Sequence, residues 1–291
     1  MKEALDFALG TEETPSEYVE DGGTMTVVSL FITLRFGIAA ILMPLLIRNV
    51  RKDLKSVEVW KGGGILAVLV LGGFLFQMHA LEELDPAVSA FLTSLYVIFT
   101  AIIISILNKK MISKPLAFGV ILATFGAGYI QGPPQIEFGK AELFTVICAL
   151  IFGFHIVATD RITKIMSPLG VTMTSITIAA IGGGLIFIYS YSTEKVTVDL
   201  NFAYETTFLI PVLLCSILGT LLALSLINYF QKDLNPVRAA ILFALEPVWA
   251  ALISIMYGMT EIGLWLFLGG GALLLGNVIS EINTEKNSKV E

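Results

Sequence analysis

Charged side chains are scarce in this sequence, and their scarcity excludes most soluble proteins. Only 14% of the 291 residues are Asp, Glu, Lys or Arg, whereas a soluble domain carries about 25%. Apolar residues make up 56% of the chain, and the mean hydropathy is +0.84. The polar surface is too small for a cytosolic enzyme, a nucleic-acid-binding protein or a disordered chain. The composition therefore predicts an integral membrane protein.

Cysteine and histidine are also rare, which narrows the chemistry. Cys148 and Cys215 lie in apolar runs, where cysteine usually packs as a small apolar side chain. His79 and His155 are far apart in the sequence and lack metal-ligand spacing. The phosphate-binding pattern G-x-x-x-x-G-K-[ST] does not occur in the sequence. We therefore expect no cofactor, no metal, no catalytic residue and no nucleic-acid partner.

Long apolar runs predict an all-α membrane protein that contacts the lipid bilayer. A helix needs about 20 apolar residues to cross the bilayer core. The runs are too long for strands and do not alternate in polarity, which disfavours a β-barrel. Nine full transmembrane helices are predicted, over Met25–Ile47, Gly62–Leu81, Pro86–Asn108, Pro115–Ile136, Leu143–Thr159, Ile165–Thr193, Thr206–Gln231, Ala239–Thr260 and Ile262–Ser280.

The distribution of Lys and Arg between the loops predicts the orientation. One side carries 14 of these residues, and the other side carries only Lys140 and Lys195. Cytoplasmic loops hold the excess of positive charge. We therefore expect a multi-pass protein of the cytoplasmic membrane, with a cytoplasmic C-terminus and a disordered cytoplasmic tail over 283–291.

The two halves of the sequence match each other at an offset of 150 residues. Leu84–Pro86 falls on Leu234–Pro236, and Gly119 and Gly126 fall on Gly269 and Gly276. Equivalent turns carry opposite charge, because the turn with Lys109 and Lys110 corresponds to Gly258–Glu261, which has neither Lys nor Arg. The pattern predicts an inverted repeat, the arrangement found in transporters that alternate access around a midplane site.

An inverted repeat requires an odd number of helices in each unit. The second unit, 140–282, has five predicted helices, whereas the first, 1–131, has four complete ones. We expect Met1–Leu9 to form a short helical stub at the outer face, where a first helix would end. An in-frame apolar stretch of about 15 residues upstream of the Met1 codon would indicate a truncated first helix, whereas a stop codon directly upstream would indicate that the nine-helix form is real, and the sequence leaves this open.

Four short motifs carry a resemblance to a known family. Taken in order and spacing they resemble the drug/metabolite transporter superfamily, EamA type, over Met25–Ile282. The motifs are Leu34–Phe36, Leu84–Leu92, Leu245–Ala251 and the small residues Gly269–Ala272 with Gly276. The family usually has ten helices, and this chain resembles a member that begins inside the first. Gly258 is followed by Met259, where the family usually has a Gly-Glu pair.

Two charged residues near the bilayer midplane are candidates for substrate binding or coupling. Arg35 lies about ten residues below the outer end of its span, where a charge is costly and usually paired or facing a cavity. It would attract an anionic group, or alternatively pair within the protein or reach the interface. Glu246 lies at similar depth, before Pro247, which frees a helix carbonyl. It would carry a proton across the cycle or pair with Arg35.

Three further side chains are candidate pocket residues. Tyr96 is the repeat equivalent of Glu246, and Trp249 lies one helical turn from Glu246. Aromatic walls suit small-molecule sites, although both rings could instead pack in the core. Gln77 lies toward the outer end of its span.

Asn228, near the cytoplasmic end of its span, is predicted to form a hydrogen bond between helices. The glycine clusters Gly62–Gly64, Gly182–Gly184 and Gly269–Gly271 are predicted to allow close helix approach.

The resemblance and the inverted repeat together predict a secondary transporter with a small-molecule substrate. The resemblance implies export of metabolites, amino acids or drugs. One alternative is a channel-like or non-transporting membrane subunit. The other is an intramembrane lipid-modifying enzyme, which would need a cluster of polar groups at one membrane interface. The sequence has no paired His, Asp or Ser-Lys arrangement near either interface, which disfavours the enzyme. The sequence leaves the substrate, the direction, the coupling ion and the oligomeric state open.

Overall fold

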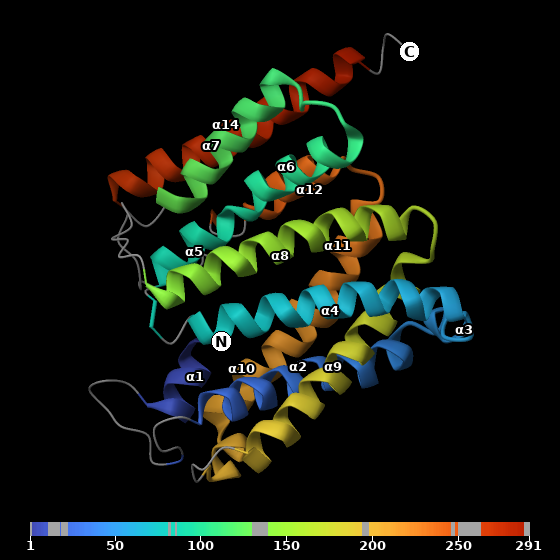
Figure 1. Ribbon diagram of the computed structural model, residues 1–291, viewed down its shortest axis with the longest axis vertical. Coiled ribbons are helices and arrows are strands. Elements are labelled where there is room, and N and C mark those ends of the chain that lie inside the picture. Colours follow the sequence, from blue (N-terminus) through green and yellow to red (C-terminus); the bar gives the residue numbers. More distant parts are fainter. Residues whose placement is uncertain are drawn as a thin grey trace. The chain divides into compact units, whose positions relative to one another are not determined.

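Helices are the main elements of the part of the chain that the computed structural model describes (Figure 1). It describes residues 2–10, 18, 23–80, 83–84, 86–129, 139–193, 198–245, 248–249 and 263–287. Within these residues, helices are long and apolar enough to cross a membrane at Thr24–Leu46, Val57–Ala80, Lys140–Thr163, Pro168–Thr193 and Thr206–Gln231. All of these helices lie at runs that the sequence predicts to be transmembrane. The chain is therefore an all-helical, multi-pass membrane protein.

The contacts divide the helices into two compact units, and each unit takes helices from both halves of the sequence. The first unit contains residues 1–82 and 161–232. Its elements are α1 (Lys2–Leu9), α2 (Thr24–Leu46), α3 (Val50–Asp53), α4 (Val57–Ala80), α9 (Pro168–Thr193), the 3-10 helix η1 (Leu200–Tyr204), α10 (Thr206–Leu214), the π-helix η2 (Cys215–Leu222) and α11 (Ala223–Gln231).

The second unit contains residues 83–160 and 233–291. Its elements are α5 (Pro86–Ser94), α6 (Tyr96–Asn108), α7 (Lys114–Tyr129), α8 (Lys140–Thr163, of which the last three residues belong to the first unit), α12 (Pro236–Phe243) and α14 (Leu264–Asn287).

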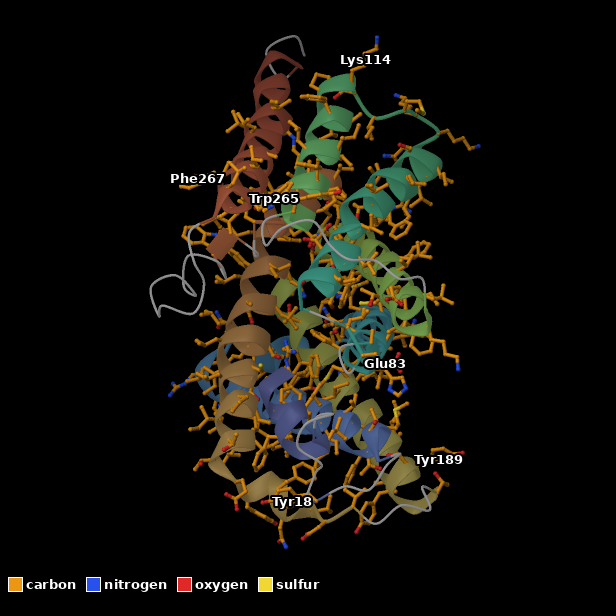
Figure 2. All side chains as sticks on the ribbon, turned by 90° about the vertical axis from the view of Figure 1, so that its left-hand side faces the viewer. Tyr18, Glu83, Lys114, Tyr189, Trp265 and Phe267 are labelled. Carbon is orange, nitrogen blue, oxygen red and sulfur yellow. The ribbon has the colours of Figure 1, made fainter. Side chains whose placement is uncertain are left out.

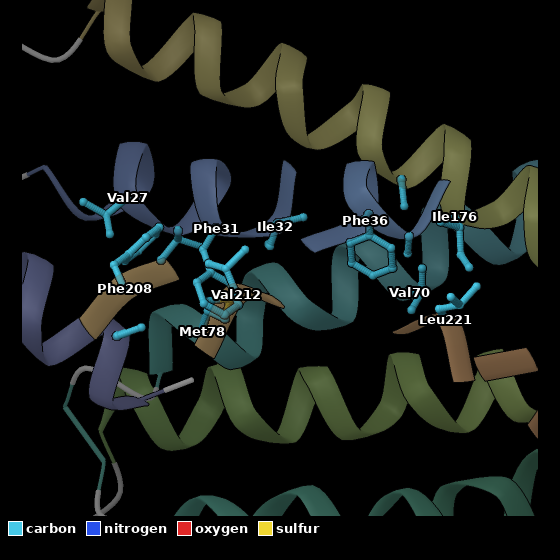
Figure 3. Packing of buried hydrophobic residues seen from close by; sticks show 14 of the residues in the cluster. Val27, Phe31, Ile32, Phe36, Val70, Met78, Ile176, Phe208, Val212 and Leu221 are labelled. Atoms are coloured by element: carbon cyan, nitrogen blue, oxygen red, sulfur yellow. The ribbon is translucent and has the colours of Figure 1, made fainter. Parts of the chain in front are cut away.

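Helices α2 and α9 form the central pair of the first unit. They approach closely because Gly183 has no side chain: a Cβ built there would lie 3.1 Å from Ile32 and from the hydroxyl of Thr33. About two helical turns away at the same interface, Thr26 Oγ1 on α2 donates to Ser190 Oγ on α9 at 3.1 Å. A buried apolar cluster surrounds the pair, and Figure 3 shows residues from α2, α4, α9 and η2 within it.

Helices α7 and α14 form the corresponding central pair of the second unit and lie side by side (Figure 1). Two glycines make this contact possible. A Cβ built on Gly126 would lie 2.5 Å from the carbonyl oxygen of Gly269, and one built on Gly276 would lie 2.8 Å from that of Gly119. The prediction of close helix approach is thus confirmed for Gly183 and for the backbone at Gly269, whereas Gly271 faces open space.

The predicted span Pro86–Asn108 is not one continuous helix. It is divided into α5 and α6 at Leu95, whose N–H bonds to the carbonyl of Leu92, three residues back, at 3.2 Å. The span expected from Ala239 begins three residues earlier, at Pro236, because Asn235 caps the helix by accepting from the N–H of Val237. Hydropathy alone indicates a span and does not register such local changes in backbone hydrogen bonding.

The two ends of the chain differ in their agreement with the sequence predictions. A helix over Lys2–Leu9 confirms the expected helical stub, and its buried residues Ala4, Leu5 and Ala8 belong to the core of the first unit. At the other end, α14 continues to Asn287, five residues into the stretch 283–291 for which the sequence predicts disorder, and that disorder stays a prediction. No Gly or Pro follows Gly276, so nothing in the sequence stops the helix before that point.

Large apolar side chains cover the outside of both units. Phe267 on α14 and Tyr189 on α9 are exposed and point away from the helices that carry them (Figure 2). In water such a surface would aggregate, whereas in a bilayer it meets lipid chains of the same polarity. The exposed residues thus agree with a chain that is embedded in a membrane.

Candidate functional site: a buried arginine against a π-helix

Arg35 lies midway along α2, between Thr24 and Leu46, and its side chain is only 7% exposed. Its neighbours in the sequence, Leu34 and Phe36, are apolar. Placing a guanidinium at this depth costs free energy unless other groups replace its water. The structure supplies those groups from two other segments of the first unit.

The guanidinium is held by one hydroxyl and two aromatic rings. Nε donates to Thr220 Oγ1 at 2.7 Å, and Thr220 is fully buried. Cζ lies 4.4 Å from the centroid of the Phe74 ring on α4 and 5.6 Å from that of Phe36. A charge-assisted hydrogen bond and cation–π contacts in a water-poor interior are each worth about 1–3 kcal/mol. These contacts fix the position of the Arg35 side chain.

The hydroxyl that binds Arg35 belongs to the π-helix η2. The wider turns of a π-helix displace side chains from their α-helical positions, and such segments occur frequently at functional sites. The preceding residue, Gly219, leaves room for the charge, because a Cβ built there would lie 3.4 Å from Arg35 Nη2. Sequence reasoning missed Thr220 and Phe74. The small residues Ser216, Gly219 and Thr220 in an apolar run were the available signal.

Gln77 is the other predicted site residue in the first unit. It is half-buried on α4, three residues after Phe74. Side chains three residues apart on a helix are neighbours, with about 5–6 Å between their Cβ atoms. Gln77 thus lies one turn from the ring that contacts the Arg35 guanidinium.

The remaining predicted site residues belong to the segments of the second unit. Tyr96 is partly buried at the first position of α6, directly after the break at Leu95. Trp249 is 64% exposed, so its ring is not packed in the core. Glu246 lies outside the described residues.

The backbone deviates from α-helical geometry at two equivalent positions of the second unit. The N–H of Leu95 bonds to Leu92, and the N–H of Leu245 bonds to Leu242 at 3.1 Å, each three residues back instead of four. The two pairs are separated by 150 residues, the offset at which the two halves of the sequence match each other. Interrupted helices at corresponding positions of two halves are typical of the binding region of transporters.

Asn228 forms the interhelical bond that the sequence predicts. Its Nδ2 donates to Thr172 Oγ1 at 2.8 Å and so connects α11 to α9. Among the described residues, no group of three or more His, Cys, Asp and Glu side chains could hold a metal ion.

Apolar helices of membrane-spanning length, one of which encloses a charged side chain midway along its length, define a polytopic membrane protein. The profile of the EamA-like transporter family matches residues 24–130 and again residues 139–281. This chain therefore belongs to the EamA-like transporter family. Membership places it among transporters rather than enzymes, with a small-molecule substrate.

Relatives agree with this assignment. An uncharacterized transporter of Archaeoglobus fulgidus is 27% identical over 227 residues, which cover 77% of this chain and 67% of the relative. The uncharacterized transporter YyaM of Bacillus subtilis is 23% identical, over 88% of this chain and 87% of its own length. Protein LicB of Haemophilus influenzae is 26% identical, over 91% and 85%. A solved crystal structure with 15% identity has the same fold, with a TM-score of 0.71 over 91% of this chain and 90% of its own.

Proposed function

We propose that the protein is a secondary transporter that exports small metabolites, amino acids or drugs across the cell membrane by alternating access. The observation that carries the proposal is Arg35, a cation enclosed at the centre of a membrane helix and bound by the hydroxyl of Thr220. A fixed positive charge at this depth provides a binding partner for an anionic group of the substrate. The excess of Lys and Arg in alternate loops supports a cytoplasmic C-terminus.

The inverted repeat is part of the proposal, and the packing of α7 and α14 supports it. Gly119 and Gly126 are the repeat equivalents of Gly269 and Gly276. The contact of Gly126 with Gly269 therefore has a symmetry-related partner, the contact of Gly276 with Gly119. Equal contacts exchanged in this way are expected of two helices related by a two-fold axis. The family profile matches once in each half of the sequence, which also supports two sequence repeats over 1–131 and 140–282.

Transport by proteoliposomes tests the role of Arg35. Purified protein is reconstituted in vesicles loaded with a panel of unlabelled amino acids, hydroxy acids, other metabolites and drugs, including apolar compounds without hydrogen-bond donors, and uptake of each labelled compound by exchange is measured. We expect Arg35→Met to lower exchange at least tenfold, because the substrate loses a charged partner worth about 1.5–3 kcal/mol. Arg35→Lys keeps the charge but not the Nε donor, so it should retain an intermediate rate.

Arg48→Met is the matched control, because Arg48 is exposed just after α2 and should exchange at the wild-type rate. A well-folded Arg35→Met protein that exchanges like wild type would contradict the role of Arg35. If no compound exchanges in wild-type vesicles, the transport function itself is wrong.

Proton coupling through Glu246 is the second element of the proposal. If this carboxyl carries the proton, an imposed pH gradient should drive net flux in the wild type. Glu246→Gln should then abolish the response to the gradient while exchange at equal pH continues. If the flux of Glu246→Gln still follows the pH gradient, Glu246 does not carry the proton and this element of the proposal is wrong.

A further inference from the structure

The buried face of the helix Thr206–Gln231 changes character along its length. Toward its beginning the buried residues are Phe208 and Val212, which are apolar. From its middle onward the buried face carries polar side chains, interrupted by Leu221 alone. We call these five residues the polar stripe: Ser216, Thr220, Ser225, Asn228 and Gln231.

The π-helix keeps the polar stripe on one face. Its turns over Cys215–Leu222 are wider than those of an α-helix and rotate the helix that follows, so Ser225 on α11 can share a side with Ser216 and Thr220. Ser225, Asn228 and Gln231 then follow at intervals of three along α11. At a rise of about 1.5 Å per residue, the stripe from Thr220 to Gln231 is about 16 Å long, half the thickness of the bilayer core. It therefore leads from Arg35 to the end of the span next to Lys232.

Two side chains of the polar stripe have unused hydrogen-bonding capacity. Asn228 is 3% exposed, and its Oδ1 has no partner among the described residues, although its Nδ2 bonds to Thr172. Ser225 is 8% exposed, and its Oγ likewise has no partner in the described part of the chain. Each such group costs about 1–3 kcal/mol when buried. Ser225 Oγ and Asn228 Oδ1, three residues apart on α11, are therefore available to a hydrogen-bond donor from outside the protein.

We propose that the polar stripe lines the cytoplasmic half of the substrate's path, closed in this conformation. The inference rests on the proposed transport function and narrows the substrate class. A solute on this path offers an acidic group to Arg35 and then hydrogen-bond donors, ammonium or hydroxyl, to Ser225 and Asn228. The class is thus amino acids and hydroxy acids, and apolar compounds without donors are excluded. Opening the path requires α9 to move relative to α11, because the bond from Asn228 to Thr172 joins them.

Cysteine accessibility tests this path. In a background with Cys148→Ala and Cys215→Ala, the variants Ser225→Cys, Asn228→Cys and Leu226→Cys are exposed to a membrane-impermeant cationic methanethiosulfonate. The reagent is added to inside-out or to right-side-out vesicles. Leu226 is the matched control, because it lies between the two test residues on α11 and is 47% exposed. Leu226 is exposed on the span and therefore faces lipid, which a membrane-impermeant reagent does not enter, so Leu226→Cys gives the rate of a position off the path. In a rigid protein the buried positions would react no faster than Leu226→Cys.

We expect Ser225→Cys and Asn228→Cys to react at least tenfold faster than Leu226→Cys, and only in inside-out vesicles. A compound that exchanges in the amino-acid and hydroxy-acid panel should slow both reactions. Ser225→Cys replaces one oxygen by sulfur, so it keeps the test valid if Asn228→Cys does not fold.

The flux of the cysteine-free protein separates the two ways in which the idea could fail. If exchange is measured but both positions react as slowly as Leu226→Cys, or react from the outside, the path is overturned and the transport function stands. If the chain exchanges only compounds without donor groups, the proposed substrate class is overturned. If neither the wild type nor the cysteine-free protein exchanges any compound, the transport function is overturned.

Discussion

The contact between α7 and α14 offers a sharp test of the packing, because one methyl group should disrupt it. A Cβ on Gly126 would lie 2.5 Å from the carbonyl oxygen of Gly269 and from the backbone nitrogen of Leu273, whereas ordinary contacts are 3.4–4 Å. Both opposing atoms belong to the backbone, so no side chain can rotate away. Gly126→Ala must therefore push the two helices apart by about 1 Å, and such overpacking costs about 1–3 kcal/mol.

The cost is measurable as a lower melting temperature of the detergent-purified protein. With roughly 2–4 °C per kcal/mol in chains of 150–250 residues, Gly126→Ala should melt about 2–12 °C below wild type. Gly276→Ala should behave similarly, because its Cβ would lie 2.8 Å from the oxygen of Gly119. The double variant should lose less than the sum of the two, since one separation of the helices relieves both clashes.

Gly271→Ala is the control for this experiment. It lies on the same helix, and nothing is found within 4 Å of its built Cβ. The change should leave stability equal or slightly higher, because alanine favours a helix by up to about 1 kcal/mol over glycine. If Gly126→Ala melts at the same temperature as Gly271→Ala, the described contact between α7 and α14 is wrong.

Two further hydrogen bonds give predictions with internal controls. Thr220→Val removes the acceptor of the Arg35 Nε–H and should lower the free energy of unfolding by about 1.5–3 kcal/mol, measured as a lower melting temperature. Thr220→Ser keeps the hydroxyl and should keep most of the stability. Equal melting temperatures of the two variants would refute the contact. Ser167→Ala removes the bond of its Oγ to Asp53 Oδ2 at 2.6 Å and should lower the melting temperature by about 2–4 °C, the equivalent of about 1 kcal/mol. Ser192→Ala, whose hydroxyl is exposed and bonds only within α9, should not change it, and a loss as large as that of Ser167→Ala would contradict this assignment.

The sequence by itself determined the class of the protein and most of its helices. A membrane helix satisfies its own backbone hydrogen bonds, so a local run of apolar residues is sufficient to specify it. The described spans at α2, α4, α8, α9 and Thr206–Gln231 therefore coincide with predicted runs. The depth of Arg35 followed from its position in such a run in the same way. The order of the family motifs indicated the EamA type, which the family profile shows.

Only the tertiary structure decided what surrounds Arg35. Thr220 is 185 residues away in the sequence, and hydropathy does not specify which face of one helix meets which residue of another. In lipid, all apolar faces are nearly equivalent, so helix pairing depends on close packing and on a few hydrogen bonds. The breaks at Leu95 and Leu245 and the π-helix at Cys215–Leu222 escaped prediction for a related reason. Each changes the backbone by a single hydrogen-bond step within an apolar run, and such a step leaves no mark on composition.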